Sequence, residues 1–105
     1  SSDLRRAREQ NPELPVIVEA DSVALANQLL PLRPDRILLD NLSPKEVAEV
    51  VATGKRSGAP VPVEASGQVT LERAKDLAHA GADFISVGAL THSAKAIDFA
   101  LDWKS

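Results

Sequence analysis

Four short runs of aliphatic and β-branched residues recur along the chain, and each is followed by apolar residues at helical spacing. The runs are PVIVEA, RILLD, VPVEAS and FISVG, at residues 15–20, 36–40, 61–66 and 84–88. Their starts lie 21 to 25 residues apart, which suits a crossover helix but is too short for a hairpin together with a helix. Connections between parallel strands are right-handed. The pattern therefore predicts an α/β fold in which a βα unit is repeated four times.

Polar residues and glycines mark the ends of the expected helices. SPKE at 43–46 has the pattern of a capping box, with Ser43 as the N-cap and Glu46 three residues later. Thr70 caps the next helix, and Gly81 suits the left-handed position after its end. The other expected helices are 1–10, ahead of the first strand, one that begins at Asp21 or Ser22, and a last one over about 92–103.

Composition excludes several classes of partner. The 105 residues are enough for one small domain. The net charge of −3 comes from interspersed signs, and no apolar run approaches the length of a membrane span. We therefore expect no nucleic-acid partner and no membrane partner. Without cysteine there is no disulfide and no thiolate metal site, and the first residues do not resemble a signal peptide. These properties are typical of a cytoplasmic protein.

Acidic and hydroxyl side chains gather near the carboxyl ends of the four expected strands. Because side chains alternate between the two faces of a strand, they share the face that the helices leave open. They are Glu19, Asp40, Glu64, Ser66 and Ser86, joined by Gly88. Ligands bind at this edge in parallel α/β proteins, and carboxylates gathered there need a cation or hydroxyl donors. Each carboxylate could instead cap the next helix, and Glu64 could pair with a neighbouring residue of the sheet.

Two glycines lie between an expected strand and an expected helix, where backbone N–H groups can approach a phosphate. They are Gly67 in EASGQVT at 64–70 and Gly88 in SVGALT at 86–91. Each glycine alone could be a tight turn, but the pair on adjacent strands indicates a phosphate site. His92, expected in the first turn of the last helix, is either a neutral donor to that phosphate or a cap.

Three motifs resemble the quinolinate phosphoribosyltransferases, also called nicotinate-nucleotide pyrophosphorylases (carboxylating). They are ILLDN at 37–41, EASG at 64–67 and SVGALTHSAK at 86–95, and the likeness runs from about residue 15 to 103. That family forms nicotinate mononucleotide, pyrophosphate and carbon dioxide from quinolinate and phosphoribosyl pyrophosphate in NAD biosynthesis, with Mg²⁺. The resemblance implies four βα units of a TIM-like (β/α) barrel, preceded by one helix, with residues 1–105 forming the C-terminal half of that domain.

The resemblance also implies roles for named residues. Glu19 and Asp40 are the expected catalytic residues and Mg²⁺ ligands, which hold the ribose hydroxyls and the metal-bound pyrophosphate. The expected phosphate-binding residues are Ser66, Gly67, Gln68, Val87, Gly88, Ala89 and His92. The chain departs from the family at Gln68, where many members have a second glycine, and at Ile17, where many have a glutamate.

The sequence lacks residues suited to bind quinolinate, which accepts the phosphoribosyl group in that reaction. No Arg or Lys ends an expected strand, and the two carboxylates of quinolinate need cations. We expect a chain that is inactive alone and that self-associates as a homo-oligomer, because half a barrel leaves open sheet edges. Two alternatives are a non-catalytic phosphate-binding or assembly fragment, and a receiver domain of two-component signalling with Asp40 as phosphate acceptor. The receiver reading lacks the lysine that would end the last strand.

Overall fold

The computed structural model describes residues 5–6, 9–10, 12–58, 60–67, 70–88 and 90–97. Within them, one sheet contains strands in the order β1-β2-β3-β4-β5, which is also their order in the chain. The strands are β1 (Ile17–Ala20), β2 (Arg36–Asp40), β3 (Val63–Ser66), β4 (Phe84–Val87) and β5 (Leu90–Ser93). The first four strands are parallel, as predicted, and β5 is antiparallel to β4.

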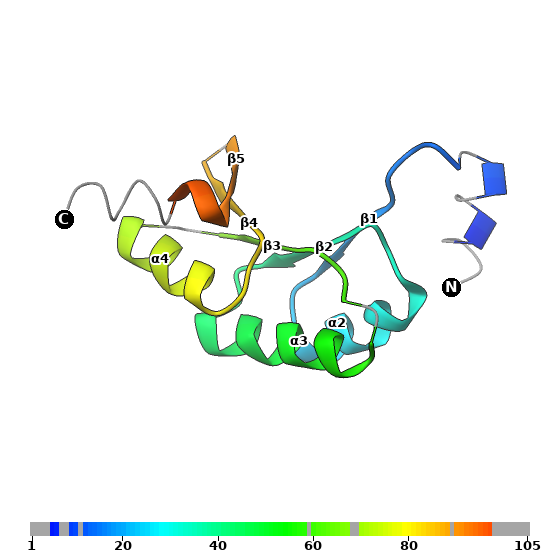
Figure 1. Cartoon of the computed structure of the whole chain (residues 1–105), viewed down its shortest axis with the longest axis horizontal. Coiled ribbons are helices and arrows are strands. Elements are labelled where there is room, and N and C mark those ends of the chain that lie inside the picture. The colour runs from blue at the N-terminus through cyan, green and yellow to red at the C-terminus, as the bar shows by residue number, and fades with distance from the viewer. Residues whose placement is uncertain are drawn as a thin grey trace.

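The helices cover one face of the sheet (Figure 1). They are α2 (Val23–Leu29), the short 3₁₀ helix η1 (Leu30–Leu32), α3 (Pro44–Arg56) and α4 (Leu71–His79). Alternate strand residues point under them and are buried, including Ile37, Leu39, Val63, Ala65 and Ile85. The predicted alternation is therefore confirmed, and the opposite face of the sheet carries the polar side chains.

Side-chain caps start the helices where the sequence placed them. The Glu46 N–H donates to Ser43 Oγ at 3.2 Å, and the Ser43 N–H donates to Glu46 Oε1 at 3.0 Å, which completes the capping box of α3. Thr70 Oγ1 accepts from the Arg73 N–H at 3.1 Å at the start of α4. The first predicted helix falls largely outside the described residues, of which 5–6 and 9–10 are helical.

The prediction for the last segment was wrong. We expected a helix from about His92, but Leu90–Ser93 form β5, and helical structure starts at residue 94. Gly88, with φ +63°, allows the chain to turn back on itself, so Leu90 pairs with Val87 and Thr91 with Ser86. Gly88 therefore lies in the turn of a β4–β5 hairpin and does not lead into a helix. The end of the predicted helix, with Trp103, lies outside the described residues.

Gly81 ends α4 at a point where the chain runs close to α3. Its φ is +108°, and a Cβ there would lie 2.9 Å from Val51 Cγ1, closer than real Cβ contacts. Glycine is thus required at this position both by backbone conformation and by packing.

Gly81→Ala should lower the free energy of unfolding by about 1 to 3 kcal/mol, because it adds backbone strain and a clash with Val51. Gly54→Ala is the control, since Gly54 lies within α3 and its Cβ would meet nothing within 4 Å. Alanine there should leave stability unchanged or raise it. Urea denaturation of the two variants measures the difference, and equal midpoints would contradict the packing of α4 on α3.

The α3 capping box should make stability depend on pH. Hydrogen bonds from the backbone N–H and side chain of Ser43 lower the pKa of Glu46 below its ordinary value of 4.5. A lowered folded-state pKa stabilises the fold above the unfolded-state value, and this contribution is lost as pH falls through the folded-state value. Denaturation curves should therefore separate wild type from Glu46→Gln near neutral pH and converge in acid. A constant separation would contradict this assignment.

Candidate functional site

Asp40 and Ser66 meet at the carboxyl edge of the sheet. They are the last residues of β2 and β3 and are paired in the parallel register. Ser66 Oγ donates to Asp40 Oδ1 at 3.2 Å, and the Asn41 N–H donates to the Ser66 carbonyl at 2.8 Å. Both side chains are partly exposed, so they remain open to a ligand.

Glu19 lies on the same face of the sheet, on β1. It is in register with Leu38, which is two residues before Asp40 on the neighbouring strand, and it is exposed. Side chains two residues apart on a strand share a face, so Glu19 and Asp40 are diagonal neighbours across β1 and β2. The structure thus brings both predicted carboxylates to one face near one edge.

Glu64 does not stand at that edge. It lies deeper in the sheet, is 8% exposed, and accepts a hydrogen bond from Arg36 Nη1 at 2.9 Å. The Arg36 guanidinium lies 3.8 Å over the Phe84 ring. Of the two readings that the sequence left open for Glu64, pairing with a neighbouring strand residue is the correct one. Arg36 was missed, although its position in RILLD shares the face of Asp40.

The loops after β2 and β3 are in contact next to Asp40. Gly67 has φ +133°, and a Cβ on it would lie 3.2 Å from both the Cα and the Oδ1 of Asn41. This close approach and the positive φ both require glycine at this position. Gln68, the next expected phosphate ligand, lies outside the described residues.

His92 reaches the start of α4 from β5 and not from a helix of its own. It is in register with Ile85, whose side chain is buried under the helices, so His92 points to the same side. With Thr70, Leu71 and Val87 it lines a cavity of about 330 Å³. His92 therefore lies beside the N-terminus of α4. Ala89, in the turn after Gly88, is outside the described residues.

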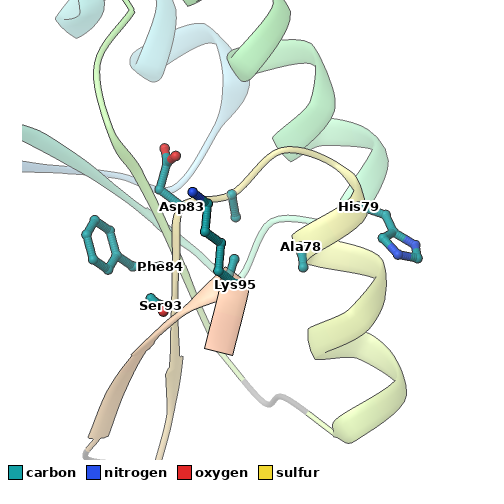
Figure 2. A pocket seen from close by; sticks show the side chains of 8 residues that line it. Ala78, His79, Asp83, Phe84, Ser93 and Lys95 are labelled. Carbon is teal, nitrogen blue, oxygen red and sulfur yellow. The ribbon is translucent and has the colours of Figure 1, made fainter. Parts of the chain in front are cut away.

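A second hollow, of about 390 Å³, lies at the opposite, amino end of β4 (Figure 2). Figure 2 shows Asp83 and Lys95 beside it. Asp83 has a structural function, since its Oδ2 accepts from the Val63 N–H at 2.9 Å and its carbonyl accepts from the Ala94 N–H at 2.8 Å. Lys95 lines the same hollow, at this end of β4 and away from Gly88.

Metal binding at the carboxyl edge would need oxygen atoms from a ligand. Among the described residues, no group of three or more His, Asp or Glu side chains is placed to hold an ion. Glu19 and Asp40 offer carboxylate oxygens, and Mg²⁺ is commonly held by one or two carboxylates together with substrate phosphates. The donor set therefore fits magnesium only in the company of a phosphate-bearing ligand.

The model of the quinolinate phosphoribosyl transferase C-terminal domain matches residues 1–102. The chain belongs to this family. It is 42% identical over 100 residues to a nicotinate-nucleotide pyrophosphorylase [carboxylating] of Mycobacterium leprae, covering 94% of this chain and 35% of that protein. It is 39% identical over 88 residues to the human protein of the same name, covering 84% and 30%.

Solved structures show the same fold. A nicotinate-nucleotide pyrophosphorylase of Francisella tularensis superimposes with a TM-score of 0.72 at 25% identity, covering 88% of this chain and 33% of that one. This member of the quinolinate phosphoribosyl transferase family thus spans about a third of the length of the relatives it matches. None of the helices in the described part of the chain has the length and apolar character needed to cross a membrane.

Gly67→Ala should separate the loops after β2 and β3, because a Cβ would press on Asn41. We expect a loss of about 1 to 3 kcal/mol in stability and a shifted NMR signal for the Asn41 side-chain amide. Gly58→Ala is the matched control, since Gly58 also has a positive φ, +79°, but open space around it. An unchanged Asn41 signal in Gly67→Ala would contradict the contact.

Proposed function

We propose that this chain forms the phosphoribosyl side of a quinolinate phosphoribosyltransferase site. The reaction is the conversion of quinolinate and phosphoribosyl pyrophosphate to nicotinate mononucleotide, pyrophosphate and carbon dioxide. The supporting observation is the joined pair of Asp40 and Ser66, adjacent to the Gly67 loop that leads toward α4. Acidic groups for a sugar and a helix N-terminus for a phosphate thus lie along one edge.

Asp40 and Glu19 act on the ribose. Carboxylate oxygens accept hydrogen bonds from sugar hydroxyls, and they stabilise the positive charge that develops on the ribose ring as pyrophosphate leaves. Ser66 orients Asp40 through its 3.2 Å hydrogen bond. Because both carboxylates stand on the strands of one sheet, they face the sugar in a fixed geometry before the reaction begins.

The 5′-phosphate binds at the start of α4. The helix is nine residues long, and its first N–H groups attract an anion. In this proposal Ser66 and Gly67 bind the phosphate from the loop after β3, and Val87 and Gly88 bind it from the β4–β5 hairpin. Gln68 and Ala89, the other two expected ligands, lie outside the described residues. His92 donates from beside the cavity that it shares with Thr70. The predicted set of phosphate ligands is retained in this proposal, with His92 on a strand.

Mg²⁺ would bind at this site together with phosphoribosyl pyrophosphate. Glu19 and Asp40 would hold Mg²⁺ directly or through water, and the ion would neutralise charge on the departing pyrophosphate. The positive charge of the ion would also reduce the repulsion between the two carboxylates on this face of the sheet.

The quinolinate carboxylates need cations, and no Arg or Lys stands at the carboxyl end of a described strand. Arg36 is the only Arg or Lys in the five described strands, and Glu64 holds it at the amino end of β2. We propose that segments corresponding to the rest of the relatives' length bind quinolinate, close the sheet into a barrel and support a homo-oligomer. A multiply charged phosphosugar does not cross a membrane unaided, and we propose that the reaction takes place in the cytoplasm.

Isothermal titration with phosphoribosyl pyrophosphate and Mg²⁺ tests the proposal. Wild type should bind, and Asp40→Asn should weaken binding about tenfold or more, because it removes a charged acceptor. Asp76→Asn, an exposed change on α4, should bind as wild type. No binding by wild type would overturn the proposal.

One alternative predicts the same binding. A non-catalytic phosphate-binding fragment would bind the donor, yet the complete protein that contains this chain would release no pyrophosphate when quinolinate is added. The receiver-domain alternative is wrong, because the chain belongs to the quinolinate phosphoribosyl transferase family.

A further inference from the structure

We propose that Glu64 is a positioning residue, which holds the β4–β5 hairpin in the place where it grips the donor phosphate. This inference rests on the proposed function only for the identity of the ligand. The tether itself is a property of the unliganded chain and is argued from its contacts.

Both oxygens of the Glu64 carboxylate are occupied, and from different directions. Oε1 accepts from Arg36 Nη1 at 2.9 Å, across β2 and β3. Oε2 accepts from Ser86 Oγ at 2.5 Å and lies 3.5 Å from Thr91 Oγ1. The Glu64 side chain is only 11% exposed, so water competes little for these hydrogen bonds. One carboxylate thus links β2, β3, β4 and β5.

The two hydroxyls lie on either arm of the hairpin. Ser86 on β4 and Thr91 on β5 are partners in the antiparallel register, and their Oγ atoms are 3.3 Å apart. The turn between them contains Gly88. A carboxylate that contacts both arms below the turn limits how far the turn can tilt from the sheet.

The same contact sets the position of His92. Thr91 and His92 are neighbours on β5, so their side chains point to opposite faces. While Thr91 faces Glu64 on the open face, His92 faces the cavity beside Thr70 and α4. A hairpin that slid or tilted would carry His92 and the Gly88 turn away from α4 together.

Arg36 keeps the Glu64 carboxylate aimed at the hairpin. Its guanidinium is held between the carboxylate and the Phe84 ring, 3.8 Å from the ring centre. Arg36 begins the strand that ends in Asp40. Through Arg36 and Glu64, β2, which carries Asp40, is therefore connected to the β4–β5 hairpin, which is proposed to bind the phosphate. Glu64 can thus position the hairpin relative to Asp40.

The experiment compares hydroxyl-deleting with hydroxyl-keeping variants of the full chain. S86A–T91V removes both hydroxyls and leaves the Arg36–Glu64 ion pair intact. S86T–T91S keeps both hydroxyls and exchanges their carriers. Glu64→Gln removes the charge, with Glu49→Gln on α3 as its control. Amide hydrogen exchange is measured without ligand, and affinity is measured with ribose 5-phosphate.

We expect faster exchange at residues 86–92 in S86A–T91V and in Glu64→Gln, with β2 and β3 amides unchanged in S86A–T91V. Affinity for ribose 5-phosphate should fall about tenfold in both, because a displaced binding group loses its alignment. S86T–T91S and Glu49→Gln should match wild type. A general loss of stability would instead accelerate exchange in all strands.

If S86A–T91V has the exchange rates and the affinity of wild type, the proposed role of Glu64 is overturned. This holds even if Glu64→Gln fails to fold. Failure of the proposed function gives a different result, since wild type itself would not bind ribose 5-phosphate. The exchange rates of the unliganded variants would still decide whether Glu64 holds the hairpin.

Discussion

The candidate site is built around the parallel register of β2 and β3. Hydrogen bonds between these strands place Asp40 opposite Ser66 and bring the Gly67 loop onto Asn41. β1 and β4 then extend the sheet on either side, which puts Glu19 on one flank and the β4–β5 hairpin on the other. A shift of one residue would turn the acidic side chains under the helices and the core residues outward. The buried partners, such as Ile37 and Leu39, forbid that shift.

Glu64, in the middle of the open face of the sheet, has a partner for each of its carboxylate oxygens. Glu64 would be costly at its depth without partners, and Arg36 and Ser86 supply them. This satisfied pair leaves Asp40 and Glu19 as the carboxylates with room for a ligand. Glu64 has a structural role and Asp40 is available to a ligand because the two lie at different depths in the sheet. Glu64 is two residues before the end of β3, while Asp40 is the last residue of β2.

Much of this arrangement could be predicted from the sequence. The spacing of the apolar runs indicated the parallel strands, and Ser43 and Thr70 marked helix starts that the structure confirms. Arg36 could have been found too, because it alternates with Leu38 and Asp40 on the same strand. Arg36 stands at the amino end of β2, whereas the predicted site residues lie at the carboxyl ends of the strands.

β5 could not be predicted from local pattern. Its four residues, LTHS, are all exposed and precede a helical segment, so local propensity favours extending the helix. Pairing with β4 and the hydroxyl contacts of Thr91 with Ser86 and Glu64 decide the outcome, and these contacts connect residues that are distant in sequence or separated by a turn. His92 thus lies near the proposed phosphate site, as expected, but on a strand and not on a helix.

The proposed function depends on the binding of a phosphosugar at the carboxyl edge of the sheet. A crystal structure of the chain with ribose 5-phosphate tests this most directly. We expect the phosphate between the Gly67 loop and the Gly88 turn, within hydrogen-bond distance of His92, and the ribose hydroxyls at Asp40. A phosphate found instead in the hollow beside Asp83 and Lys95, at the amino end of β4, would contradict it.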